Sequence, residues 1–339
     1  IKKLIKSIFS KFQDVCANIS NMQIPALIYE GDESLLPEIF ERINSQGAKL
    51  TKQQIYAATW AQDLVKLENT KFDEIINNNR DRYENMLDED MELEDYNPTE
   101  LTRKKEVNIF ELVFGFGKMI SKKYPYLFTY EENDKTKVES IGFNLINACL
   151  VQRSANMRKL NINLKDIIGL ETHSIEEFLS RIIEAIEYVD KRLGAGTKFK
   201  SNKRSTSKIY PLHTELQIVS IIATVFINRH ASFELNNKGE VKNLVIDTSM
   251  FNKQWRDMKD TFDKNILKIY AMDILGQKWK GTGDKKLDNI IIENYYYNRN
   301  VSWEGFEQVL DVYYNTINNE RNEQKQVAQP KEPEKLILN

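Results

Sequence analysis

The chain has 339 residues, 41% hydrophobic and 29% charged, so it is long enough for two domains and has the composition of a soluble globular protein. Its formal net charge of −2 excludes a protein that binds nucleic acid through overall positive charge, and any such binding would need a local patch. No apolar run approaches the roughly 20 residues that cross a bilayer. We therefore expect a cytoplasmic protein with no membrane partner.

Low contents of glycine and proline, with 13 and 7 residues, favour helices over strands. Apolar residues recur at helical spacing along most of the chain, which predicts a mainly α fold organised as a multi-helix bundle. A short apolar run at residues 24–29 predicts one buried strand near the N-terminus. The predicted helices cover residues 52–67, 72–86, 108–122, 138–151, 175–193, 213–227, 251–275, 285–293 and 303–317.

An acidic stretch at residues 88–95, followed by Asn97 and Pro98, marks the best domain boundary. Its carboxylates lack the spacing of a calcium loop, so a solvated linker is favoured over a cation site. We expect a first domain over residues 1–97, an all-α domain over residues 98–320 and a polar tail over residues 321–339.

The most distinctive stretch covers residues 24–60. The predicted strand at residues 24–29 is followed by a helix, a polar loop at residues 44–47 and a second helix. Gly47 lies just past the first helix, where a left-handed residue is often required. This loop is the part of the stretch that a generic helical protein would not need.

The ordered sequence IFERINSQGAKL at residues 39–50, followed by IYAA at residues 55–58, resembles a known family. It is similar to the ParB-like domain that forms the N-terminal half of GmrSD-type, modification-dependent restriction enzymes and related phage-defence proteins. The resemblance covers residues 24–60 closely and the remainder only in helical character. It implies that the strand is a β remnant of a ParB-like α+β domain, and that the complete protein couples nucleotide hydrolysis to recognition and cleavage of foreign or modified DNA.

The resemblance also implies a role for the polar loop. Backbone N–H groups and side chains there would face a nucleotide or DNA phosphate. A structural alternative stays open, because the same residues would also end one helix and set the angle to the next. The residues concerned are Arg42, Asn44, Ser45 and Gly47.

Two signatures of that family do not occur in the sequence. The catalytic Asp-Gly-Gln-Gln-Arg segment is absent, as is the His-containing metal site of an HNH nuclease domain. The chain begins at Ile1 without an initiator Met, and its last residues, 335–339, resemble the start of another helix. We therefore expect a fragment with no catalytic residues, no metal ligands and no cofactor of its own. The resemblance allows a nucleoside triphosphate and a divalent metal in the complete protein, with the rest of that protein or a nuclease subunit as partner.

A basic segment at residues 191–208 carries seven cations and no acid. Such a segment favours contacts with nucleic-acid phosphates and a salt-sensitive affinity, while a solvated loop between two helices is the alternative. Its cations are Lys191, Arg192, Lys198, Lys200, Lys203, Arg204 and Lys208.

The three histidines, His173, His213 and His230, lie far apart without the spacing of a metal or catalytic pair. Helix-capping or surface roles are expected for all three. The sequence thus leaves two functional hypotheses: part of a GmrSD-like protein, inactive by itself, or a non-catalytic helical module that binds DNA or a protein.

Overall fold

The computed structural model describes residues 52–88, 97–128, 135–197, 213–270 and 283–298, together with the isolated positions 9, 11–13, 15–16, 31, 39, 272–273, 279, 304 and 308. The predicted strand at residues 24–29, the acidic stretch beyond residue 88, the helix at residues 303–317 and the tail lie outside the described residues or almost entirely so.

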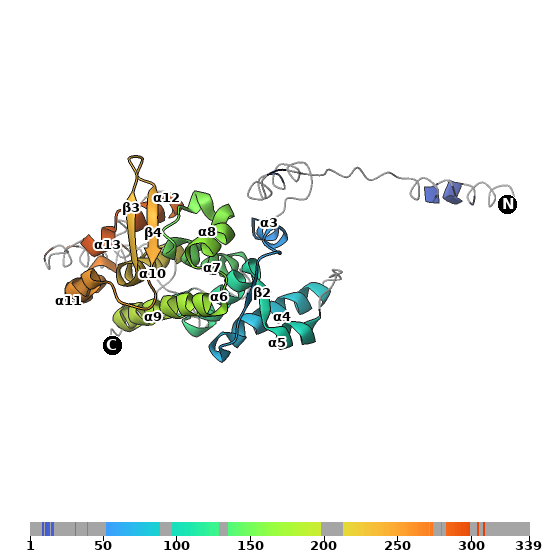
Figure 1. Cartoon of the computed structure of the whole chain (residues 1–339), viewed down its shortest axis with the longest axis horizontal. Coiled ribbons are helices and arrows are strands. Elements are labelled where there is room, and N and C mark those ends of the chain that lie inside the picture. Colours follow the sequence, from blue (N-terminus) through green and yellow to red (C-terminus); the bar gives the residue numbers. More distant parts are fainter. Residues whose placement is uncertain are drawn as a thin grey trace, which may run out of the picture.

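The described chain is mainly helical, as predicted, with two small antiparallel two-stranded sheets (Figure 1). The α-helices are α3 (Lys52–Thr59), α4 (Asp73–Asp88), α5 (Pro98–Lys104), α6 (Ile109–Lys123), α7 (Lys135–Cys149), α8 (Leu160–Ile167), α9 (Thr172–Thr197), α10 (Glu215–His230), α11 (Lys253–Tyr270), α12 (Gly283–Ile292) and α13 (Tyr295–Asn298). The strands are β1 (Leu64–Lys66), β2 (Glu106–Asn108), β3 (Ala231–Leu235) and β4 (Val241–Ile246). Two short 3₁₀ helices are η3 (Thr70–Phe72) and η4 (Ser154–Lys159).

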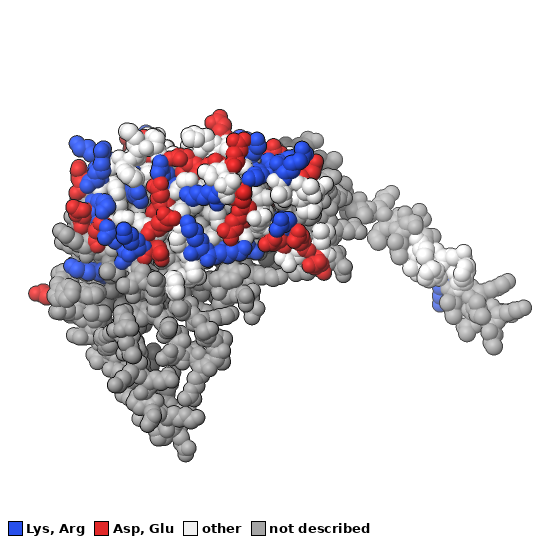
Figure 2. All heavy atoms as spheres, turned by 90° about the horizontal axis from the view of Figure 1, so that it is seen from below, with Lys and Arg blue, Asp and Glu red and all other residues white. Residues whose placement is uncertain are grey.

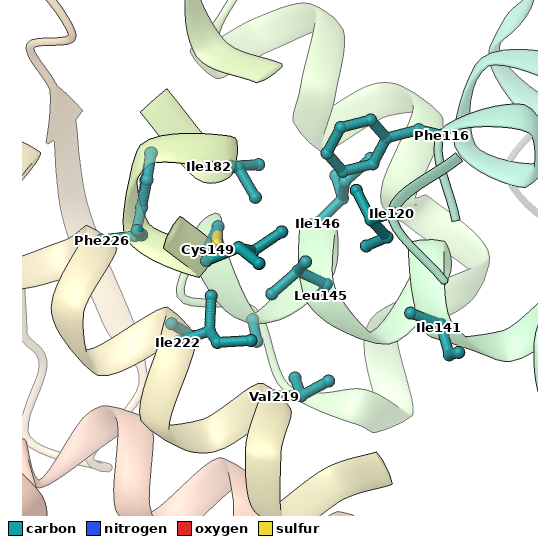
Figure 3. Close-up of a cluster of buried hydrophobic side chains, with 14 of the residues drawn as sticks. Phe116, Ile120, Ile141, Leu145, Ile146, Cys149, Ile182, Val219, Ile222 and Phe226 are labelled. Carbon is teal, nitrogen blue, oxygen red and sulfur yellow. The ribbon is translucent and has the colours of Figure 1, made fainter. Parts of the chain in front are cut away.

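Helix α6 is the centre of the core. Its side chains are buried nearly all round, as the apolar pattern of residues 108–122 predicts, and it packs between α4 and α7. Asn108 caps its start, and the Glu111 carboxylate bonds back to the backbone N–H of Asn108. Figure 3 shows how α6, α7, α9 and α10 bring their aliphatic and aromatic side chains together in one cluster.

The helix predicted over residues 52–67 is wrong in its second half. Helix α3 ends at Thr59, and residues 64–66 form β1, which pairs with β2 in the register Val65 to Val107. The strand partner is about forty positions away along the chain, so local periodicity carries no signal for it. This pairing also connects the two sides of the predicted boundary at residue 97, and the domain division itself stays a prediction.

Residues 231–246 form a β3–β4 hairpin, whereas an all-α domain is predicted over residues 98–320. In Figure 1 the hairpin projects from the body beside α10 and α12. Asn236 closes its turn by accepting the N–H groups of Lys238 and Glu240. Gly239 adopts a positive φ of 72° there, a conformation that favours glycine.

The other predicted helices that lie within the described residues are found with shifted ends. Helix α9 begins at Thr172, three residues before the predicted start at residue 175. Helix α10 has a capping box from Thr214 to Gln217. None of the described helices is both long enough and apolar enough to span a membrane.

Candidate nucleic-acid interface

The four predicted loop residues, Arg42, Asn44, Ser45 and Gly47, lie outside the described residues. What the structure shows is how the helix that follows them is held. Tyr56 of α3 and Trp60, which directly follows α3, stack with ring centroids 4.6 Å apart, and both pack against Phe143 of α7. Helix α3 is therefore anchored in the core at its C-terminal end.

Two of the seven predicted patch residues, Lys191 and Arg192, are described. The other five, Lys198, Lys200, Lys203, Arg204 and Lys208, lie outside the described residues. Lys191 and Arg192 lie in the last turns of α9. Lys191 is exposed, as a phosphate contact requires, whereas Arg192 is engaged by a neighbouring helix.

The partner of Arg192 is Asp263 of α11. The Arg192 Nη2 donates to Asp263 Oδ2 at 2.5 Å, and the Lys259 Nζ donates to the same oxygen at 2.6 Å. Both cations also lie near the ring of Tyr188 in α9, at 5.4 Å from the Arg192 guanidinium and 6.0 Å from the Lys259 ammonium to its centroid. One carboxylate and one ring therefore hold two cations side by side.

We call Arg192 and Lys259 the carboxylate-bridged pair. The exposed fraction of their side chains differs sharply from that of Asp263, which bridges them. The side chain of Asp263 is 13% exposed, against 36% for Arg192 and 40% for Lys259. The carboxylate side chain is thus largely covered, whereas both cationic side chains are partly open to solvent. The i,i+4 spacing of Lys259 and Asp263 was visible in the sequence, but nothing there related them to Arg192.

The C-terminal half of α9 lies beside α11, at the end of the body away from α4 and α5 (Figure 1). The face in Figure 2 mixes Lys and Arg with Asp and Glu over its described part. No broad region of one sign is present on that described surface, so any binding of a polyanion there depends on local cations.

The expected capping or surface roles of His213 and His230 are wrong, because both side chains are buried. The ring of His213 lies 2.7 Å from the Tyr270 hydroxyl through Nδ1 and 2.6 Å from the Leu127 carbonyl through Nε2. Since a carbonyl only accepts, the Nε2–H donates to Leu127 and Nδ1 accepts from Tyr270. His213 thus joins the start of α10 to the end of α11.

Burial lowers the pKa of His213 to about 4. Burial and the neighbouring Arg229 guanidinium lower the pKa of His230 to about 4 as well. Both rings are therefore neutral at neutral pH, and His213, bonded through both nitrogens, is a structural residue. Burial also raises the pKa of the Cys149 thiol, which opposes formation of a reactive thiolate.

Among the residues that the structure describes, no group of His, Cys, Asp or Glu side chains could hold a metal ion. Comparison with known proteins gives no further guide to function, since no protein-family model, curated protein or solved structure matches the chain.

Proposed function

We propose that this chain is a portion of a GmrSD-like restriction or defence protein that couples nucleotide hydrolysis to recognition and cleavage of foreign or modified DNA. The ordered motif at residues 39–58 carries the proposal. The chain supplies a helical body that holds a phosphate-facing loop and contacts DNA through the basic segment at residues 191–208. By itself it is catalytically inactive, and the complete protein uses a nucleoside triphosphate and a divalent metal.

The packing of α3 supports the first part of this proposal. A loop that contacts a phosphate has to be held in place, since misplacement by about 1 Å can cost a hundredfold in rate. The loop at residues 44–47 ends five positions before α3 begins, and the rings of Tyr56 in α3 and of Trp60 just after it are fixed in the core. The alternative of a structural loop is tested by Arg42→Gln, which should weaken nucleotide binding by the complete protein without lowering its melting temperature.

The end of α9 supports the DNA contact. Lys191 is exposed there, and five further cations follow within residues 198–208. If these groups contact phosphates, DNA affinity must fall steeply with salt, because each contact releases about 0.9 counterion from duplex DNA. For four contacts this amounts to about a hundredfold loss in affinity between 50 and 200 mM salt.

The test is DNA binding by the 339-residue chain, measured by fluorescence anisotropy over a salt series. Replacing Lys198, Lys200, Lys203, Arg204 and Lys208 with glutamine should reduce the salt slope by about 3 to 5. The matched control replaces five other cations with glutamine and should leave the slope much closer to that of the unmodified chain. These control residues are Lys66, Lys71, Arg103, Lys104 and Lys165.

Equal losses in the two sets would mean that net charge alone governs binding and would refute the interface. Hydrolysis of a nucleotide or cleavage of DNA by this chain would refute its proposed inactivity. An Asp-Gly-Gln-Gln-Arg segment encoded in the same reading frame upstream would support the family assignment.

A further inference from the structure

We propose that the carboxylate-bridged pair of Arg192 and Lys259 is a preorganised binding site for a DNA phosphate, with Asp263 holding the two cations in place. This inference rests on the proposed contact between the end of α9 and DNA. It adds a residue from α11, Lys259, which lies about fifty positions beyond the end of the basic segment and belongs to no basic run.

Arg192 and Lys259 together have enough N–H groups to bind a phosphate as well as Asp263. An arginine side chain has five N–H groups and a lysine ammonium has three. Asp263 takes one from each through a single oxygen. Donors on both cations remain for an oxyanion that approaches from solvent, where both side chains are more than a third exposed.

The geometry lowers the cost of binding. A free surface lysine or arginine loses rotamer freedom when it is fixed on a phosphate, and this loss weakens binding. Here the carboxylate and the Tyr188 ring already hold both cations in one place. The three side chains together carry a net charge of +1, and Arg192 directly follows the exposed Lys191 in α9.

A purely structural salt bridge makes different predictions from a phosphate site. If Arg192, Lys259 and Asp263 only fasten α11 to α9, substitution changes stability and leaves the salt dependence of DNA binding unchanged. If the cations contact a phosphate, Lys259→Gln lowers the salt slope by about 1 and weakens DNA binding about tenfold at 50 mM salt and about threefold at 200 mM. Arg192→Gln should do the same.

Asp263→Asn provides the opposite change. It keeps both cations and removes the covered negative charge, so DNA affinity should rise at low salt by a factor similar to the loss in Lys259→Gln. The matched control is Lys104→Gln, which removes an ion-paired helical lysine with 48% exposure on α5, at the other end of the body (Figure 1). It should leave the salt slope within error, and melting temperatures show that each variant is folded.

The outcomes separate this inference from the proposed function. Salt-dependent DNA binding that is lowered by the substitutions at residues 198–208 but untouched by Lys259→Gln and Asp263→Asn would overturn the inference alone. No salt-dependent DNA binding by the unmodified chain would overturn both. Inorganic phosphate, added at constant ionic strength, should compete weakly with DNA. A different result would also overturn the assignment to DNA. In that case free phosphate binds tightly, and Lys259→Gln abolishes this binding without changing the affinity for DNA.

Discussion

Single glycines decide how closely the central helices approach. Gly117 of α6 and Gly142 of α7 face one another, and a Cβ on Gly142 would lie 2.1 Å from the carbonyl oxygen of Val113. A Cβ on Gly117 would lie 2.7 Å from the backbone nitrogen of Gly142. Because the obstacles are backbone atoms, no side chain can rotate to make room.

Gly142→Ala should therefore destabilise the protein despite the higher helix propensity of alanine. Separating two packed helices is an overpacking change, and we expect a loss of about 3 kcal/mol in the free energy of unfolding. Urea denaturation measures it. Gly283→Ala is the control, since its Cβ would meet only the movable Leu216 side chain, and it should change stability by less than about 1 kcal/mol. A neutral Gly142→Ala would mean that α6 and α7 are not in backbone contact.

At the scale of elements, α9 extends from the β1 region to α11. Near its start, the Glu176 carboxylate accepts the backbone N–H groups of Glu68 and Asn69 at 2.6 and 2.7 Å. Near its end, Arg192 contacts Asp263 of α11. This one helix thus joins the chain that follows β1 to the proposed phosphate site.

Glu176→Ala should cost about 1 kcal/mol, because two backbone donors at the surface exchange their charged acceptor for water. Glu176→Gln keeps an oxygen acceptor and should lose about half as much or less. Thermal unfolding of the two variants measures the difference. Glu171→Ala, at an exposed position just before α9, is the control for loss of a carboxylate. Identical stability of Glu176→Ala and the unmodified chain would contradict this connection.

At the scale of the whole molecule, two buried histidines make stability depend on pH. The pKa values of His213 and His230 are about 4 in the folded chain, whereas an unperturbed histidine titrates near 6.5. Between these values the unfolded chain binds more protons than the folded one. The free energy of unfolding therefore falls as pH decreases from about 6.5 to about 4 and levels off below that.

The full effect is on the order of 3 kcal/mol for each ring. Urea denaturation between about pH 7.5 and pH 4.5 measures the slope. His213→Gln should lower stability at neutral pH and reduce the slope by roughly half. His173→Gln, at an exposed histidine, should retain the slope that the two buried rings produce. A slope unchanged in both His213→Gln and His230→Gln would mean that other groups cause the acid sensitivity.

The sequence by itself determined the helical character of this protein, because the spacing of apolar residues along α4, α6, α10 and α12 is local information. It also determined the motif at residues 39–58 and the basic segment, because residue order and charge are read directly from the sequence. Only the tertiary structure decided that residues 64–66 pair with residues 106–108, since a strand's partner is distant along the chain. It likewise decided that His213 and His230 are buried. It also decided that the largely covered carboxylate of Asp263 contacts two partly exposed cations, Arg192 and Lys259. Burial and ion pairing depend on which helices meet, and periodicity along one segment does not specify its neighbours.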